Sequence, residues 1–193
     1  MNICVYAASS DRPERLYHEA AYELGRLLAA GGHRLVYGGG LTGLMGACAR
    51  GVLDFGGQVL GVAPRFFDEP GVLLRDAGSL LLTESMAQRK TCMAERSDAF
   101  IALPGGIGTF EEFFETLTLK QLGVHDKPMA LVNTLGYYDE LQAMLLQSAE
   151  KGFMSAGVPR LYALCASPEE ALAHVCAAPS EAQSARSIED YTK

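Results

Sequence analysis

The sequence lacks the excess of positive charge that nucleic-acid and membrane-surface proteins carry. Its 16 Lys and Arg residues are outnumbered by 23 Asp and Glu residues, which gives a net charge of −7. We therefore expect neither a nucleic acid nor an anionic membrane as the main partner, because both attract basic surfaces. A small anionic ligand is still allowed, because it needs only a local positive site.

Paired cysteines are also lacking. The five cysteines stand apart in apolar segments without a C-x-x-C pair, and the four histidines do not cluster with them. Neither a zinc site nor a disulfide framework is therefore predicted, and reduced thiols in the core are the simpler interpretation. The cysteines are Cys4, Cys48, Cys92, Cys165 and Cys176.

Long apolar runs and a basic leader are missing as well. No stretch approaches the roughly 18 apolar residues of a membrane-spanning helix, and the first residues carry only a short apolar run. This pattern predicts a cytoplasmic protein.

What the chain does contain is a regular alternation of short apolar runs and amphipathic segments. Such an alternation predicts an α/β fold, a doubly wound parallel sheet with helices on both faces. Residues 1–176 are expected to form one domain, and the Ser- and Ala-rich residues 177–193 a mobile tail. The predicted strands lie near residues 3–8, 33–37, 58–62, 80–82, 98–103, 128–132 and 161–165.

The most informative stretch is LPGGIGTFEEFFE, residues 103–115. A buried strand that stops at Pro-Gly-Gly and restarts as a helix leaves backbone N–H groups free for an anion. Thr109 and Glu112 have the spacing of a capping box, so a cap is an equally good interpretation of Glu112 from local sequence.

A second glycine turn, GGGLTGLMG, spans residues 38–46. It satisfies G-x-G-x-x-G, but it follows the second strand, and Ala63 and Pro64 stand where a ribose-binding acid would be expected. Neither glycine stretch is a nucleoside-triphosphate P-loop. Two short phosphate cradles favour a mononucleotide.

Arg89 and Lys90 lie near the start of a predicted helix that begins at Met86. Basic residues at this end oppose the helix dipole, so they are a poor choice for stability alone. They could be a solvated helix end. Alternatively, the Arg89 guanidinium holds a phosphate or ribose oxygen by paired hydrogen bonds.

Taken together, Met86-x-x-Arg89-Lys90, Pro104-Gly-Gly-x-Gly-Thr-x-x-Glu112, Gln121-Leu-Gly and Lys127-Pro resemble the Lonely Guy (LOG) family, formerly labelled possible lysine decarboxylases. The similarity runs from residue 2 to about residue 155. It implies a Rossmann-like homodimer that cleaves the N-glycosidic bond of N6-modified AMP, or of AMP, to free base and ribose 5-phosphate. Many members have His where this chain has Ala87, which bears on substrate preference.

The resemblance also implies which residues act. Arg89 and Glu112 correspond to the catalytic pair, and no metal or cofactor is implied; the partner is a small-molecule nucleotide. The implied substrate-binding residues are Gly39, Gly40, Gly43, Met86, Lys90, Gly105, Gly106, Ile107, Gly108, Thr109, Phe110, Glu111, Glu115 and Thr118.

The chemistry also follows from the residues. Hydrolysis of a ribosyl bond passes through an oxocarbenium-like state, which calls for a fixed negative charge. We expect Glu112, in a first helical turn, to stay ionised. Phe110, Phe113 and Phe114 exceed what one face of a lone helix can bury, so we expect subunit contact through this helix.

Two other functions fit parts of the sequence. A non-catalytic nucleotide-binding or carrier protein would need the glycines but has less use for Arg89 and Glu112. An amino-acid decarboxylase would need a cofactor-anchoring lysine, and none stands in a recognisable context.

Overall fold

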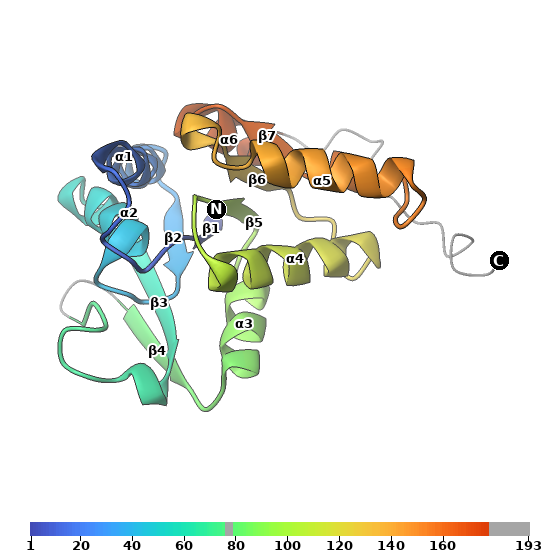
Figure 1. The fold of residues 1–193 in the computed structure, drawn as a ribbon. Coiled ribbons are helices and arrows are strands. Elements are labelled where there is room, and N and C mark those ends of the chain that lie inside the picture. Colours follow the sequence, from blue (N-terminus) through green and yellow to red (C-terminus); the bar gives the residue numbers. More distant parts are fainter. Residues whose placement is uncertain (76–78, 178–193) are drawn as a thin grey trace.

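The computed structural model describes residues 1–75 and 79–177. Seven parallel strands form one sheet in the order β4-β3-β2-β1-β5-β6-β7 (Figure 1). All seven predicted strands are present, and the doubly wound α/β prediction is confirmed. The strands are β1 Asn2–Tyr6, β2 Arg34–Tyr37, β3 Gln58–Pro64, β4 Ser79–Thr83, β5 Ala99–Ala102, β6 Met129–Val132 and β7 Ala163–Cys165.

Each crossover between neighbouring strands of the sheet, apart from the β3–β4 connection, contains an α-helix. The helices are α1 Arg15–Ala30, α2 Gly43–Asp54, α3 Met86–Glu95, α4 Ile107–Gln121, α5 Asp139–Glu150 and α6 Pro168–Cys176. Short 3-10 turns are η1 Arg65–Phe67, η2 Thr134–Gly136 and η3 Val158–Arg160.

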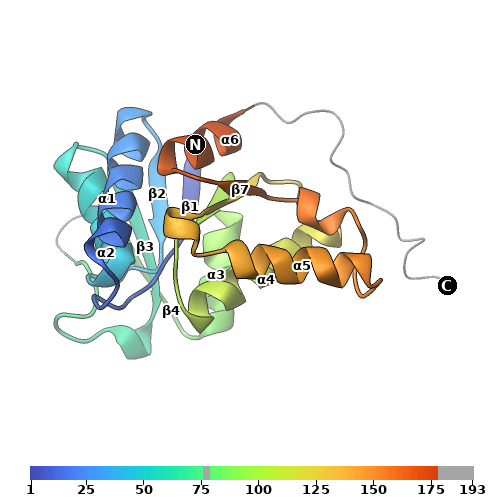
Figure 2. The ribbon, with the colours of Figure 1, turned by 45° about the horizontal axis from the view of Figure 1, so that its top comes forward.

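Two apolar cores lie on opposite faces of the sheet. In β1, Ile3 and Val5 join one core while Cys4 and Tyr6 join the other, as the two-residue period of a strand requires. Helices α1, α2 and α6 cover the first face, and α3, α4 and α5 cover the second. Figure 2 shows α1 and α2 side by side, with α3, α4 and α5 across the sheet from them.

The chain reverses direction across the sheet at β1, which pairs with β2 on one side and β5 on the other. Ligands of such sheets bind beyond the carboxyl ends of the strands at this switch point. The loops after β2 and β5 are the two glycine stretches, so both lie at this edge, beside the loop after β1.

Some predictions fall outside the described residues or on features searched only within them. Of the predicted mobile tail, 177–193, only Ala177 is described. Within residues 1–75 and 79–177, no helix is long and apolar enough to cross a membrane. The same residues contain no group of three or more His, Cys, Asp or Glu side chains placed to hold a metal ion.

Candidate active site

The loop Leu103–Gly106, here called the Pro-Gly-Gly loop, joins β5 to α4. Gly106 is the N-cap residue of α4, and no side chain caps the helix there. A Cβ atom added to Gly106 or Gly108 would meet no other atom within 4 Å, so the backbone is open at both positions. The first turn of α4 therefore presents accessible N–H groups and the positive end of the helix dipole, which favour an anion.

The capping-box interpretation of Thr109 and Glu112 is wrong. Because Gly106 takes the N-cap position, both residues lie inside α4. The Thr109 side chain instead covers Gly105, where an added Cβ would lie 2.1 Å from Thr109 Oγ1. Glu112 stands in the second turn of the helix and is free for another role.

Glu112 and Arg89 form a buried ion pair that joins α4 to α3. Arg89 Nη1 donates to Glu112 Oε1 at 2.5 Å, and Arg89 Nε donates to the carbonyl of Val62 in β3 at 3.0 Å. Only 6% of Arg89 and 9% of Glu112 is exposed. The solvated-helix-end interpretation of Arg89 is therefore wrong: the guanidinium points inward beneath the glycine loops.

The start of α3 explains how a basic pair is tolerated there. Ser85 is the N-cap residue, and its side chain accepts a hydrogen bond from Gln88 N. The Gln88 side chain accepts in turn from Glu84 N at 2.9 Å. Arg89 then follows at the end of the first turn, where its side chain reaches β3 instead of facing the free N–H groups.

Burial sets the charge state of Glu112. It raises the pKa of this carboxyl above its ordinary value, and the Arg89 guanidinium opposes that rise. The expectation that a helix N-terminus simply keeps Glu112 ionised is corrected, because Glu112 is buried and lies beyond the first turn. Arg89 is the group that favours the ionised form.

Lys90 makes a second connection between α3 and α4. Its ammonium group bonds to Glu111 and, at 2.5 Å, to Glu115. Both glutamates are exposed on the outer side of α4. The acidic neighbours of Glu112 thus pair with Lys90, while Glu112 alone pairs with Arg89.

The glycine turn, residues 38–46, is held mainly by protein contacts. The N–H groups of Leu41, Gly43 and Met45 donate to Val72 O, Asp11 Oδ1 and Ala8 O. Gly40 forms an antiparallel bridge with Leu73, so the segment between β3 and β4 lies against the turn. These contacts leave the glycine turn fewer free donors than the two predicted phosphate cradles require.

Gly38 and two tyrosines also contribute to the candidate site. The sequence places Gly38 in the glycine turn without predicting its contact with Arg89, and it predicts no role for either tyrosine. A Cβ atom added to Gly38 would lie 2.3 Å from Arg89 Nη2, so the guanidinium rests directly against this glycine. The hydroxyls of Tyr137 and Tyr138 donate to Gly105 O at 2.6 Å and Leu103 O at 2.7 Å. The consecutive tyrosines Tyr137 and Tyr138, in the segment after β6, are the sequence signal that could have indicated these two residues.

The remaining predicted substrate-binding residues line α3 and α4. Met86, the first residue of α3, is exposed one turn before Arg89, and Ile107 is 83% exposed at the start of α4. Phe110 is half-buried against Tyr137 and Tyr138. Thr118 is exposed on the fourth turn of α4, and no hydrogen bond within the described residues joins it to Arg89 or Glu112.

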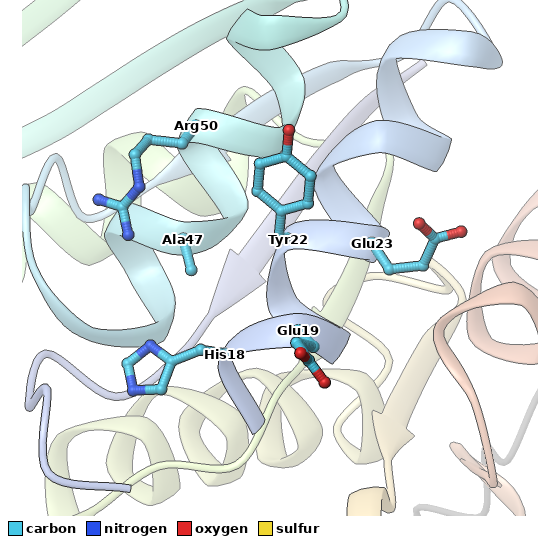
Figure 3. Close-up of a pocket in the computed structure, with 6 residues that line it drawn as sticks. All are labelled: His18, Glu19, Tyr22, Glu23, Ala47 and Arg50. Carbon is cyan, nitrogen blue, oxygen red and sulfur yellow. The ribbon is translucent and has the colours of Figure 1, made fainter. Parts of the chain in front are cut away.

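A separate hollow of about 480 Å³ lies between α1 and α2 (Figure 3). None of the predicted site residues lines it. Most of its walls are charged and polar side chains that have protein partners: Tyr22 donates to Asp54 at 2.9 Å, and Arg50 donates to Leu41 O at 3.1 Å. The lining residues are His18, Glu19, Tyr22, Glu23, Ala47 and Arg50.

Solved structures with this fold include a molybdenum cofactor carrier protein from Chlamydomonas reinhardtii. It has a TM-score of 0.68 and 23% identity, and the match covers 89% of this chain and 93% of that one. A molybdenum cofactor binding protein from Rippkaea orientalis has a TM-score of 0.65 and 21% identity, over 89% and 91%. At these identities the likeness shows a shared fold alone.

The sequence matches are much closer. The family model described as possible lysine decarboxylase matches residues 45–175. The probable cytokinin riboside 5′-monophosphate phosphoribohydrolase LOGL1 of Oryza sativa subsp. japonica is 40% identical over 99% of this chain and 80% of its own length. The cytokinin riboside 5′-monophosphate phosphoribohydrolase LOG2 of Arabidopsis thaliana is 38% identical over 98% and 83%. The chain therefore belongs to the possible lysine decarboxylase family, on its LOG branch.

Proposed function

We propose that this protein is a nucleoside 5′-monophosphate phosphoribohydrolase. It cleaves the N-glycosidic bond of N6-modified AMP, a cytokinin riboside 5′-monophosphate, or of AMP, and releases the free base and ribose 5-phosphate. The observation that carries the proposal is the buried Arg89–Glu112 pair beside the free N–H groups of the Pro-Gly-Gly loop. The activity named for LOG relatives at about 40% identity supports it.

In this mechanism the first turn of α4 holds the 5′-phosphate. The free N–H groups there are oriented before the ligand arrives, so they bind an anion without reorganisation. The ribose then extends along α4 toward its second turn, where Glu112 lies. Arg89, fixed by the Val62 carbonyl, keeps the nucleotide in register.

Hydrolysis breaks the bond between the anomeric carbon and the base nitrogen. The oxygen of a water molecule bonds to the anomeric carbon, and a water proton ends on the released base. The Glu112 carboxylate stabilises the positive charge that develops on the sugar, or orients this water. A carboxylate with a raised pKa is also a stronger base, which suits contact with the attacking water.

Product analysis tests the activity. The pure protein is incubated with AMP and with isopentenyladenosine monophosphate, and free base is followed by chromatography. We expect base from at least one nucleotide, and at least ~100-fold slower release when Glu112 is replaced by Gln. Measurable binding of both nucleotides without release of base would instead favour the non-catalytic nucleotide-binding or carrier protein.

The decarboxylase alternative is disfavoured by the positions of the lysines. Lys90 pairs with two glutamates, and the ammonium groups of Lys120 and Lys127 donate to Lys127 O and Ala94 O. Lys151 follows α5, which runs back to the opposite edge of the sheet. None of these four side chains is a free amine beside the Pro-Gly-Gly loop.

We also propose that the protein forms a homodimer through α4. The monomer buries Phe113 and half-buries Phe110 and Phe114, which accounts for part of the aromatic excess. Ile107 at one end of the helix and Leu122 just after the other are 83% and 52% exposed. Light scattering at micromolar concentration should give about twice the monomer mass of 20.7 kDa. A mass of one chain would contradict the dimer.

A further inference from the structure

Every carbonyl oxygen of the Pro-Gly-Gly loop is engaged by the protein. Each accepts one hydrogen bond: Leu103 from the Tyr138 hydroxyl at 2.7 Å, Pro104 from Ala8 N at 3.2 Å, Gly105 from the Tyr137 hydroxyl at 2.6 Å, and Gly106 from Phe110 N at 3.0 Å. The acceptors of the loop are therefore all turned toward the protein.

The backbone N–H groups of this loop and of the first turn of α4 differ from these carbonyl groups. Among the described residues, no acceptor receives the N–H groups of residues 105–109. The segment thus presents donors without acceptors to its open side, which is the arrangement that an anion requires.

The weakest point of this arrangement is the peptide between Gly105 and Gly106. In a trans peptide the carbonyl and the following N–H point in opposite directions, so fixing one fixes the other. Two consecutive glycines allow this peptide to rotate with little steric penalty. A rotated peptide would place the Gly105 oxygen where the Gly106 N–H now points, and an oxygen there repels a phosphate.

Resting on the proposed function, we propose that Tyr137 is a positioning residue for the 5′-phosphate. By donating to Gly105 O, its hydroxyl holds the Gly105–Gly106 peptide in the orientation that aims the Gly106 N–H at the anion. The ring is held separately: it stacks on Phe110 at 6.5 Å between centroids and lies edge-on to Tyr138 at 5.0 Å. Burial raises the pKa of Tyr137, so the hydroxyl keeps its proton.

Because the ring has its own contacts, Tyr137→Phe removes only the hydroxyl. We expect this variant to bind AMP and ribose 5-phosphate about tenfold more weakly by calorimetry, with adenosine binding unchanged. In the assay, KM for the nucleotide should rise by a similar factor while kcat changes less than threefold. Ribose 5-phosphate has no N-glycosidic bond, so its binding is measured without turnover. A wild-type protein that binds AMP but releases no base would therefore refute the proposed function and leave this test intact.

Tyr22→Phe is the matched control. It also deletes one tyrosine hydroxyl bond, the one that Tyr22, in the hollow between α1 and α2 (Figure 3), donates to Asp54. This variant should bind AMP like the wild type. Unchanged AMP binding in Tyr137→Phe would overturn the inference. Equal losses of affinity for AMP and adenosine would also overturn it, because a general loosening of the site weakens the binding of both ligands whether or not they carry a phosphate.

Discussion

Glu112 concentrates the proposed chemistry in one side chain. Replacing it with Gln keeps the size and one hydrogen-bond acceptor for Arg89 but removes the negative charge. Turnover should fall by at least ~100-fold, the scale of losing one electrostatic stabiliser. Circular dichroism and thermal melting are the controls that check whether the variant keeps its fold. Full activity in Glu112→Gln would leave the carboxylate a structural role only.

The raised pKa of Glu112 predicts how activity depends on pH. The carboxylate must be ionised to act, so kcat should fall as the pH drops, with a midpoint above the ordinary value of 4.5. The contribution of Glu112 to the free energy of unfolding depends on pH in the opposite direction. A raised pKa in the folded state favours folding below pH 4.5 and loses that contribution as pH rises through the raised value. Glu112→Gln should therefore melt no lower than the wild type at neutral pH, and an acid limb at or below 4.5 would contradict the assignment.

Gly38 should matter for turnover because its lack of a side chain leaves room for the Arg89 guanidinium. A methyl group at this position would displace the Arg89 guanidinium, whose flexible side chain can yield without unfolding the protein. Gly38→Ala should lose about 100-fold in turnover, as expected for misplacing a positioning group by about 1 Å. Gly157→Ala is the control, because its Cβ would have no neighbour closer than 3.6 Å. Wild-type kinetics in Gly38→Ala would show that Arg89 need not rest there.

Residue identities could be predicted from the sequence better than their contacts. Arg89 and Glu112 were both singled out, yet sequence alone could not tell a capping residue from a buried partner, because Thr109 and Glu112 fit either position in a helix. The role of Tyr137 could not be predicted, because its hydrogen-bond partner is a backbone carbonyl 32 residues away in the sequence. The contact between Gly38 and Arg89 could not be predicted, because it depends on how α3 packs against β3.

At the scale of elements, α3 depends on its first turn. Ser85 caps the helix that carries Arg89, and its loss leaves a helix N–H group without a partner. Ser85→Ala should cost about 1 kcal/mol, which lowers the melting temperature by about 2–4 °C in a protein of this size. Ser167→Ala, at the equivalent cap of α6, should cost a similar amount without changing kcat. Of the two variants, only Ser85→Ala should also reduce turnover, because α3 carries Arg89. Equal kinetics in the two variants would contradict this expectation.

The elements themselves could be predicted from sequence almost completely. Apolar runs bounded by Gly and Pro predicted all seven strands, since a parallel sheet buried on both faces needs continuous apolar strands. The start of α4 was the exception. Gly106 serves as its N-cap residue, and glycine at that position carries no side-chain signal.

At the scale of the molecule, the site is assembled from three crossovers. The loops after β1, β2 and β5 meet at one edge, and α3 adds Arg89 from a fourth segment. A nucleotide that contacts all of them binds only the folded chain. AMP at about 100 times its Kd should stabilise the protein by about 2.7 kcal/mol and raise the melting temperature by about 5–11 °C. Adenosine at the same concentration should give a smaller rise, and equal shifts would argue against a phosphate site.

The antiparallel bridge between Gly40 and Leu73 ties a connecting segment with little regular structure to one of the most constrained turns of the protein. Substitutions in that connection can reshape the ligand-facing edge without altering any signature residue. We therefore expect relatives that share every motif of this chain but differ within residues 65–75 to differ in the position of the glycine turn.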